Sequence, residues 1–488
     1  MKLLERIYTY LRVGRRGGIL IQVIAFMTIG ILILSGFVSW ASMSVRAARH
    51  AEYREQALQA AESGINYYRW HLAHDPTDFR DGTATSGPYI HDYLDKEGIK
   101  IGTFTLDITP PPLGSTLVTV RSTGRITKDA ATRRTLETKL AKPSLARFAV
   151  VANADMRFGA GTEVFGPIHV NGGVRFDGLA HNIISSARTS YDDPDHNEVG
   201  VDPLEFGVHT HIAPADPLPP ALPPSRIDVF QVGRQFPVAA FDFAGLTSDL
   251  AQMRTDAQAN GNYYAASGGQ GYYILLKTDD TYDIYRVNAI APPGGGCSDP
   301  GQAGWGTWSI NGFGAAKTAV ALGVPLPTNG LMFLEDNVWV DGKINTARLT
   351  IAAAAFPDNP ATRKSITVNN NLLYTNYDGQ DVLALIAQNN FNVGMHGSTT
   401  VRVDAAIIAQ NGRAGRYYYG AGCAPYNVRT TLTLYGMIAT NQRYGFAYTD
   451  GTGYTTRNIT YDPNLLYGPP PFFPLTTAQY QVVSWQEI

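Results

Sequence analysis

Cysteine and charged residues are both scarce in this chain of 488 residues, which has two cysteines and 16% charged residues. No CxxC or Cys/His spacing is present, so the sequence does not predict a thiolate zinc site. Lysine and arginine total 39 against 41 acidic residues, and no overall basic field favours nucleic acid as a partner. The phosphate-binding pattern G-x-x-x-x-G-K-S/T and the nucleophile pattern G-x-S-x-G are also absent. We therefore expect no cofactor and no enzyme.

Glycine (49), proline (29) and tyrosine (27) are abundant instead. Turn residues are frequent in β-rich folds, and strands favour β-branched and aromatic side chains. The composition therefore predicts a mainly β chain.

An uncharged apolar segment covers residues 19–40. About 20 apolar residues span a bilayer core of ~30 Å as a helix. A cleaved secretory signal would have a shorter apolar region and a prompt small-x-small site, so we expect a membrane anchor. The positive-inside rule places the N-terminus in the cytoplasm, because one acid, Glu5, precedes the segment against five basic residues. These are Lys2, Arg6, Arg12, Arg15 and Arg16.

The helical pattern continues beyond the apolar segment. Residues 44–71 contain no proline and are rich in alanine, glutamine, glutamate and arginine, which are good helix formers. At 1.5 Å per residue, a helix over residues 19–71 would be about 80 Å long. Its second half presents one apolar stripe for a globular head, at spacings of three and four. The stripe consists of Ala57, Ala60, Ala61, Ile65 and Tyr68.

Two stretches of this helix resemble the type IV pilin superfamily, most closely minor pilins of the PilX kind. They are RRGGILIQV at residues 15–23 and QAAESG at residues 59–64. In that family a basic leader ends in glycine, a prepilin peptidase cuts after it, and position five of the mature chain is glutamate. Matching LIQV to the family's L-I-E-V implies a cut between Gly17 and Gly18, with Gln22 at position five.

Gln22 departs from the family pattern in charge. The family glutamate offers a negative charge to the N-terminal ammonium of a neighbouring subunit inside lipid, where an unpaired charge is costly. Glutamine has the same shape and can hydrogen-bond, but it cannot form the ion pair. The resemblance therefore implies a minor or tip subunit. The alternative is an uncleaved single-span anchor in which Gln22 is a tolerated polar residue.

Three extended runs follow the helix, at residues 99–108, 116–126 and 133–140. The second and third alternate apolar and polar residues with a period of two, which predicts an antiparallel meander packed on the helix. Further on, a helix is predicted over 246–260, and two strands over 272–277 and 282–287. The predicted parts are a basic leader (1–17), the long helix (18–75), a β meander (76–142), a first β-helix-like segment with a proline-rich connector (143–225), a small α/β insertion (226–325), and β-helix repeats with a C-terminal tail (326–488).

An internal repeat supports the β-helix. The segment Ala384–Asn389 recurs as Ala406–Asn411 and as Gly436–Asn441, with starts 22 and 30 residues apart. Leu372–Asn376 resembles an earlier, degenerate coil. A period of about 20–25 residues fits a parallel β-helix, in which apolar residues stack on the next coil and turn asparagines form amide ladders. A β-sandwich with related edge strands stays open as the alternative.

Two polar clusters are candidate sites. Five histidines and nearby acids fall in one region, but their spacing matches no metal signature, so we expect a solvated polar loop and no metal. Charged residues in the repeat region show no paired-carboxylate spacing. The histidine region contains His169, His181, His196, His209, His211, Asp192, Asp193, Asp195 and Glu198, and the repeat region contains Asp378, Asp381, Arg402, Asp404, Arg413 and Arg416.

Three other features remain. Cys297 and Cys423 both lie in glycine-rich loops, and either a disulfide or two separate thiols fits the sequence. Tyr417–Tyr419 and Tyr426 either bind a sugar or surface or pack over the side of the coils. The proline-rich tail at residues 469–474 is expected to cap or strap the last coil.

The sequence thus indicates a mainly β protein with a pilin-like helix plus meander, then a parallel β-helix-like domain. We expect a minor pilin-like subunit of a type IV pilus or related filament, held in the inner membrane before assembly. Its periplasmic or extracellular head would initiate assembly or mediate adhesion at the cell surface. Expected partners are other pilin-like subunits, the prepilin peptidase, the membrane and a surface glycan. A secretion pseudopilus tip component and a membrane-tethered glycan-active β-helix enzyme are the alternatives.

Overall fold

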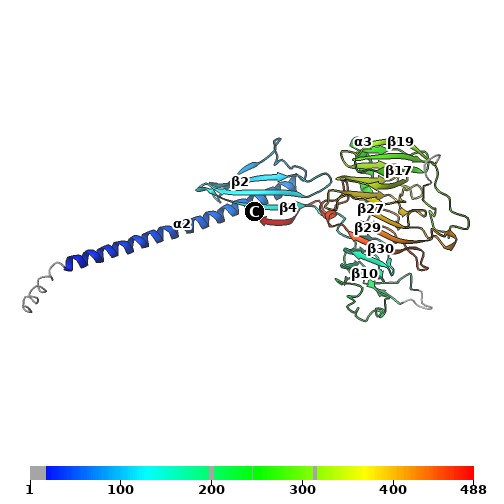
Figure 1. Cartoon of the computed structure of the whole chain (residues 1–488), viewed down its shortest axis with the longest axis horizontal. Coiled ribbons are helices and arrows are strands. Elements are labelled where there is room, and N and C mark those ends of the chain that lie inside the picture. The colour runs from blue at the N-terminus through cyan, green and yellow to red at the C-terminus, as the bar shows by residue number, and fades with distance from the viewer. Residues whose placement is uncertain (1–17, 197–202, 244–245, 311–315) are drawn as a thin grey trace, which may run out of the picture. The chain divides into compact units, whose positions relative to one another are not determined.

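The computed structural model describes residues 18–196, 203–243, 246–310 and 316–488. The chain forms two compact units. The first runs to Thr109 and also contains Thr119–Leu140 and Val482–Ile488, while the second contains Pro110–Val118 and Ala141–Gln481. A long helix and a small sheet make up the first unit, and stacked parallel strands make up the second (Figure 1). The fold class predicted from the sequence is confirmed.

Helix α2 (Gly18–His74) is one unbroken helix of 57 residues. It is the described helix that is long and apolar enough to cross a membrane. The apolar side chains of its first half, from Ile19 to Val45, are exposed. The second half packs on the sheet through the predicted stripe, extended by one glycine and one leucine. The buried residues are Ala57, Ala60, Ala61, Gly64, Ile65, Tyr68 and Leu72.

The sheet of the first unit has five strands in the order β1-β2-β3-β4-β31. The β2–β3 pair is antiparallel, as the meander prediction requires, and β1, which was not predicted, pairs antiparallel with β2. The fifth strand comes from the C-terminus and was not predicted, because seven residues carry too little pattern. Thr138 Oγ1 donates a hydrogen bond of 2.8 Å to the Ser484 carbonyl beside it. The strands are β1 (Tyr89–Leu94), β2 (Lys100–Thr109), β3 (Val118–Ile126), β4 (Asp129–Ala141) and β31 (Gln481–Glu487).

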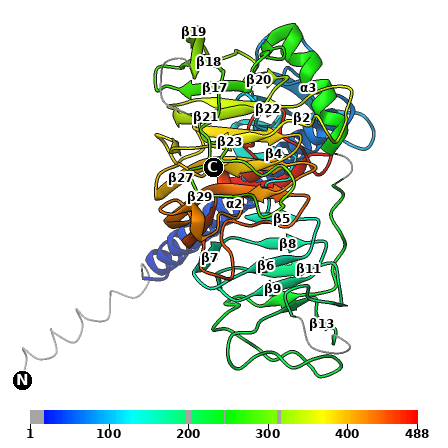
Figure 2. The ribbon, with the colours of Figure 1, turned by 90° about the vertical axis from the view of Figure 1, so that its right-hand side faces the viewer.

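The β-helix-like domain therefore lies in the chain between β4 and β31. One parallel ladder contains nine of its strands from β20 onward and is extended beyond β20 by β16 (Asn262–Tyr264); Figure 2 shows it from β20 through β29 to β5, β8 and β11. In spatial order they are β20 (Leu331–Leu334), β22 (Arg348–Ala353), β25 (Val382–Ala387), β27 (Thr400–Ala409), β29 (Val428–Thr440), β5 (Val150–Ala152), β8 (Ile168–Val170), β11 (Ile184–Ser186) and β15 (Arg234–Gln235).

The remaining strands form the other faces of the coils and the two ends. They are β6 (Met156–Phe158), β7 (Thr162–Phe165), β9 (Val174–Phe176), β10 (Leu179–Ala180), β12 (Ser190–Tyr191), β13 (Glu205–Phe206), β14 (Val208–His209), β16 (Asn262–Tyr264), β17 (Gly271–Leu276), β18 (Thr281–Val287), β19 (Lys317–Pro325), β21 (Val338–Lys343), β23 (Ile366–Val368), β24 (Leu372–Leu373), β26 (Phe391–Val393), β28 (Ala414–Gly415) and β30 (Gly453–Tyr461). Two short 3-10 helices are η1 (Ala421–Cys423) and η2 (Pro463–Leu466).

One column of buried aliphatic side chains runs through this ladder from β20 to β11. Each member is paired in register with the next and has at most 2% of its surface exposed. Such stacking buries the apolar face that a single coil would leave in water. The column is Met332, Ile351, Leu385, Ile407, Ile438, Val150, Ile168 and Ile184.

The coils do not follow one another in sequence order. The chain first builds the coils from β5 to β15, and it then starts again at the opposite end of the stack with α3 and β16. It returns coil by coil to the middle, where Ile438 of β29 pairs with Val150 of β5. A linear repeat pattern carries no information about this order, so the sequence did not predict it.

The predicted α/β insertion lies at the end of the stack that the chain reaches second. Its helix α3 spans Leu246–Asn260 as predicted. Strands β16 and β17 pair in parallel with β20 and β21, so they form the terminal coil of the stack. Strands β18 and β19 then add antiparallel to β17. Leu250, Met253 and Ala257 of α3 are buried in the cluster that contains Phe333 of β20.

The register of the third repeat differs from the sequence alignment by one residue. Ala384 pairs with Ala406 as aligned, but Ala406 pairs with Met437 rather than Gly436. A slip of one residue turns every side chain to the other face, and the inward position belongs to Ile438. Gly436, with φ of +135°, lies opposite Ala405, and a Cβ there would overlap the Ala405 carbonyl.

Two smaller predictions about the coils also need correction. Leu372 pairs with Gly342 and Val403, on another face of the coil, so Leu372–Asn376 is not an earlier copy of the repeat. The proline-rich tail does not cap an end of the stack. Its carbonyl groups at Gly468 and Pro469 accept hydrogen bonds of 2.8 Å from the side chain of Arg348, which begins β22.

The asparagines of the repeat do not form the predicted amide ladder with one another, because Asn411 and Asn441 donate to the backbone carbonyls of Gln388 and Asn411. A short amide ladder is present instead where the two halves of the stack meet. Asn153 donates to Asn441, and Asn171 donates to Asn153, each at 2.8 Å. The ladder therefore joins residues that are 288 positions apart in the sequence.

Gly124 of β3 tests the packing of the helix on the sheet. A Cβ at this position would overlap the carbonyl oxygen of Ala57 and would lie 2.6 Å from the nitrogen of Ala61. We expect Gly124→Ala to lower the opening free energy of β2–β4 by about 1–3 kcal/mol, the usual range for overpacking. Hydrogen–deuterium exchange of the backbone amides of β2–β4, with the full chain in detergent, measures this opening free energy. The control is Arg125→Ala, at an exposed neighbouring position. Equal protection in both variants would contradict the close helix–sheet contact.

Candidate functional site

The exposed apolar half of α2 is the first candidate site. No charged residue occurs between Gly18 and Ser44. Gly18 is the first residue of the helix, and Gly17 lies outside the described residues together with the leader. Gln22 is exposed on this helix. Its amide can donate and accept hydrogen bonds, but it adds no charge to a surface that suits lipid or another apolar helix.

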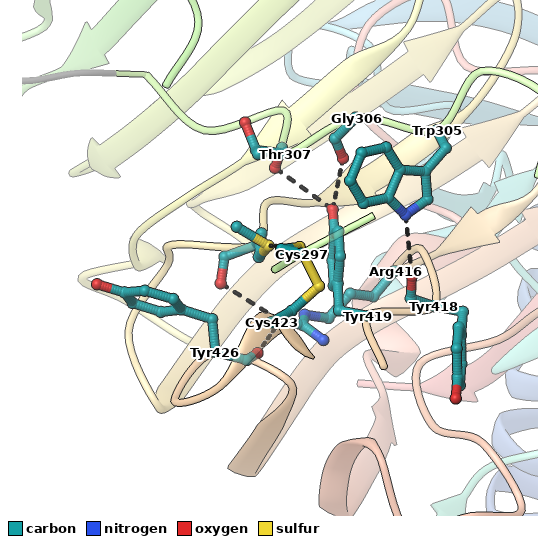
Figure 3. Close-up of a disulfide and its surroundings, with 10 residues drawn as sticks. Cys297, Trp305, Gly306, Thr307, Arg416, Tyr418, Tyr419, Cys423 and Tyr426 are labelled. Carbon is teal, nitrogen blue, oxygen red and sulfur yellow. Dashed lines mark hydrogen bonds between the residues drawn. A yellow bond between two sulfur atoms is a disulfide. The ribbon is translucent and has the colours of Figure 1, made fainter. Parts of the chain in front are cut away.

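The second candidate is the loop cluster around the two cysteines, which the structure joins in a disulfide (Figure 3). Cys423 ends η1 and is buried, and aromatic and sulfur side chains surround the bond. Trp305 Nε1 donates to the Tyr418 carbonyl at 3.0 Å, and the Tyr419 hydroxyl donates to the Gly306 carbonyl at 2.6 Å. The bond and these contacts fasten the loop at residues 291–310 to the loop at residues 412–427.

Arg416 fixes the same cluster from inside. Its side chain is fully buried and lies 4.5 Å from the ring centre of Tyr419. It donates to the carbonyl oxygens of Met395 and Tyr426. Burial lowers the pKa of the Arg416 guanidinium to about 10, because the charged form loses hydration. The guanidinium serves the loop backbone and is not presented to solvent.

The tyrosine run largely packs over the side of the coils. Tyr417 and Tyr419 are buried at 3% and 1% exposure. Tyr426 is exposed, and the Tyr418 hydroxyl donates to the Asp450 carboxylate at 2.7 Å. The packing interpretation therefore holds for the two buried rings.

Two acids of the repeat region are buried and hydrogen-bonded within the coils. Asp381 is buried and accepts hydrogen bonds from three backbone N–H groups, those of Ala347, Thr375 and Asn376, at 2.6–3.0 Å. Asp404 is also buried. Its partners are the Tyr374 N–H, the Tyr377 hydroxyl and the Arg402 guanidinium, at 2.7–3.0 Å. Asp378 is exposed and holds only its own turn. The two buried carboxylates hold the turns of the coils.

A cavity of about 730 Å³ opens near the pairing of β30 with β7, where the two runs of coils meet. Four arginines line it, together with four aromatic residues and one carboxylate, that of Asp195. Arg443 forms an ion pair with Asp195, and the buried Arg457 is bonded to carbonyl groups and to Thr162. The sequence showed no cluster, because these side chains come from coils far apart in the chain. They are Arg157, Arg413, Arg443, Arg457, Tyr444, Phe446, Tyr448 and Tyr454.

The histidine region is not a solvated loop, so that expectation is wrong. His209, Asp193 and Glu205 are exposed by 0%, 3% and 2%. With His196 and His211 they converge beside β12, β13 and β14. Two overlapping sets of possible ligands share His211: Asp193 with His209, and His196 with Glu205, with all ligand atoms of a set within 4.8 Å of one another.

The electrostatics of this cluster reflect its burial. Burial lowers the pKa of the His211 imidazole below its ordinary value. Burial would raise the pKa of the Asp193 carboxyl, but His209, the Asp195 N–H and Arg175 together hold it well below its usual range. His169 and His181 lie apart from the cluster and contact Ser185 and Gln231. Glu198 lies outside the described residues.

Taken by its fold, the chain combines a long N-terminal helix on a small antiparallel sheet with a large β-helix-like domain inserted before the last strand. It is similar to a pilin of known structure, the competence-associated pilin ComZ from Thermus thermophilus. The two share 14% sequence identity with a TM-score of 0.33, and the match covers 89% of this chain and 98% of that one. No protein-family model and no curated protein matches the chain.

The disulfide closes a long loop, since its cysteines are 126 positions apart. Removing such a cross-link typically costs about 2–5 kcal/mol of the free energy of unfolding. We expect the double variant Cys297→Ser/Cys423→Ser to lose about 2–5 kcal/mol of the free energy of unfolding. Its urea midpoint, followed by tryptophan fluorescence, should be lower than that of the wild type. Reductant should shift the wild type to the same midpoint and leave the variant unchanged. A reductant effect on both proteins would mean that the effect does not come from this bond.

Asp381 and Asp378 form a matched pair for the role of the acids. In Asp381→Asn an NH2 group would face a backbone N–H, so the variant should lose about 1–3 kcal/mol of the free energy of unfolding. Asp378→Asn should leave the urea midpoint unchanged, because this carboxylate is exposed and serves only a local turn. Equal midpoints for both variants would contradict the structural role of Asp381.

Proposed function

We propose that this protein is a minor pilin-like subunit of a type IV pilus or a related filament. The division of α2 carries the proposal: an uncharged half with exposed apolar side chains is followed by a half whose small residues are buried against the sheet. The first half is suited to lipid before assembly and to the helices of other subunits afterwards. In this state the N-terminus lies in the cytoplasm and the head lies outside the inner membrane.

The neutral Gln22 supports a subunit of low abundance. A helix with glutamine at this position cannot neutralise the terminal ammonium of a neighbour, so a long row of such subunits would leave buried charges unpaired. A subunit placed once, at a tip or start of a filament, does not need that ion pair. The size of the inserted β domain fits the same position, because it has to be accommodated only once.

We further propose that the β domain displays a surface and is not an enzyme. A glycan-cleaving site needs two carboxylates on either side of the bond to be broken. The described cavity is lined by arginine, tyrosine and threonine with one carboxylate, which already pairs with Arg443. Aromatic faces and guanidinium groups suit recognition of a surface glycan, through ring stacking and charge-assisted hydrogen bonds.

The mass of the mature N-terminus tests the proposal. The protein would be recovered from its native envelope with and without the prepilin peptidase. We expect a chain that starts at Gly18 when the peptidase is present, and a chain that keeps the leader when it is absent. A Gly17→Trp variant should keep the leader in both cells, whereas Gln22→Ala should still be cleaved.

An intact leader in both cells would contradict the pilin-like function. The protein would then be a permanent single-span anchor for its β domain.

A further inference from the structure

The buried histidine cluster at the β15 end of the stack has no role in the proposed function. Its five residues come from three short segments. Asp193 and His196 follow β12, Glu205 begins β13, and His209 and His211 lie at and after β14. Strands β12 and β13 pair with each other, and β14 pairs in parallel with β9 of the stack. The cluster therefore lies where the last loops meet the coils.

The hydrogen bonding of His209 leaves one nitrogen without a partner. Its Nδ1–H donates to the Phe206 carbonyl at 3.3 Å, so the neutral ring carries its lone pair on Nε2. This Nε2 atom is buried, makes no hydrogen bond, and faces the Asp193 carboxylate at 3.5 Å. A lone pair and a carboxylate oxygen repel each other unless a proton or a metal ion lies between them.

Glu205 also lies beside two imidazoles. Its Oε1 is 3.0 Å from His196 Nδ1 and 3.2 Å from His211 Nε2. Three imidazoles thus converge on two buried carboxylates, and the ring centres of His196 and His209 are 4.7 Å and 5.1 Å from that of His211. Several protonated rings this close would repel one another. A divalent cation bound to His211, together with either Asp193 and His209 or Glu205 and His196, would balance a carboxylate charge and accept the imidazole lone pairs.

The guanidinium of Arg175 lies beside the cluster. Its NH1 atom is 3.5 Å from Asp193, but its Nε is 2.7 Å from Asp177, which balances its charge. Asp195 is paired with Arg443, so it is not needed by the cluster. Asp193 and Glu205 therefore remain for a cation.

We propose that this cluster is a structural site for one divalent transition-metal ion of the zinc class, with His211 as a ligand. The donors are imidazole nitrogens and carboxylate oxygens, which suit zinc better than calcium or magnesium. Ligand atoms around tetrahedral zinc lie about 3.3 Å apart, and the contacts of 3.0, 3.2 and 3.5 Å are close to this value. The Phe206 carbonyl orients His209, as second-shell acceptors do in zinc sites. The ion would fasten the loops at residues 190–211 to the end of the stack.

The test is a zinc titration of the full chain in detergent, after removal of metal by EDTA, in competition with a chromogenic chelator. We expect one equivalent of zinc per wild-type chain. His211→Gln should weaken binding more than about 100-fold, because even outer-shell changes cost about 10–100-fold. The matched control is His181→Gln, which removes a half-buried imidazole 3.4 Å from Glu163 in the same domain. His181→Gln should bind zinc as tightly as the wild type does. Zinc should raise the melting temperatures of the wild type and of His181→Gln, but not that of His211→Gln.

Equal zinc binding by the wild type and by His211→Gln would overturn the proposal, and so would no binding by the wild type. The cluster would then be a set of imidazolium–carboxylate pairs. X-ray absorption of the zinc-loaded wild type decides the matter if His211→Gln does not fold. A first shell at about 2.0 Å with imidazole scattering supports the site, and a shell of oxygen alone overturns it.

Discussion

The inward column of aliphatic side chains is the constraint on which the second unit depends. In a parallel stack each coil presents one apolar side to the coil before it and one to the coil after it, so the register of every strand is set by its neighbours. The column from Met332 to Ile184 is unbroken although the chain joins its two parts out of order. The contact of Ile438 with Val150 makes one core from two runs of coils. Hydrogen bonds of Asn153 with Asn441 and Asn171 join the same two runs of coils.

The order of the coils also explains how so large a domain can be inserted in the chain between two neighbouring strands of a small sheet, β4 and β31. Because the two runs meet in the middle of the stack, the chain enters and leaves this unit near the junction and not at opposite ends. Strand β4 can therefore be followed by more than three hundred residues before β31 completes the same sheet. The helix–sheet unit keeps its core, in which Gly124 allows the close approach of α2. The proposed filament function needs a helix–sheet unit with its own core, because α2 has to assemble with other subunits regardless of the domain inserted before β31.

The ends and loops of a stack need partners that the next coil would otherwise supply. At one end α3 and the antiparallel strands β18 and β19 supply them. At the side, the disulfide and the buried Arg416 fasten two long loops. At the other end, short strands and buried polar groups take this place, and the proposed metal ion would fasten them. The three devices use different chemistry for one physical problem: backbone and loops that no further coil covers.

Local pattern determined a large part of this protein. The apolar segment and the alanine stripe predicted α2, and period-two alternation predicted β3 and β4, because each depends on neighbours a few residues away. The repeated Ala-Leu-Ile-Ala-Gln-Asn pattern predicted parallel coils, because it recurs along the sequence itself. What depends on distant neighbours was decided only by the tertiary structure. The register at Gly436 was set by Ala405, the partner of β4 came from the C-terminus, and the coil order was fixed where Ile438 meets Val150. The same holds for the sites: the sequence left the pairing of Cys297 with Cys423 open, and it took His209 for a loop residue. Packing between segments far apart in the chain buried that imidazole, and no spacing along the sequence records such packing.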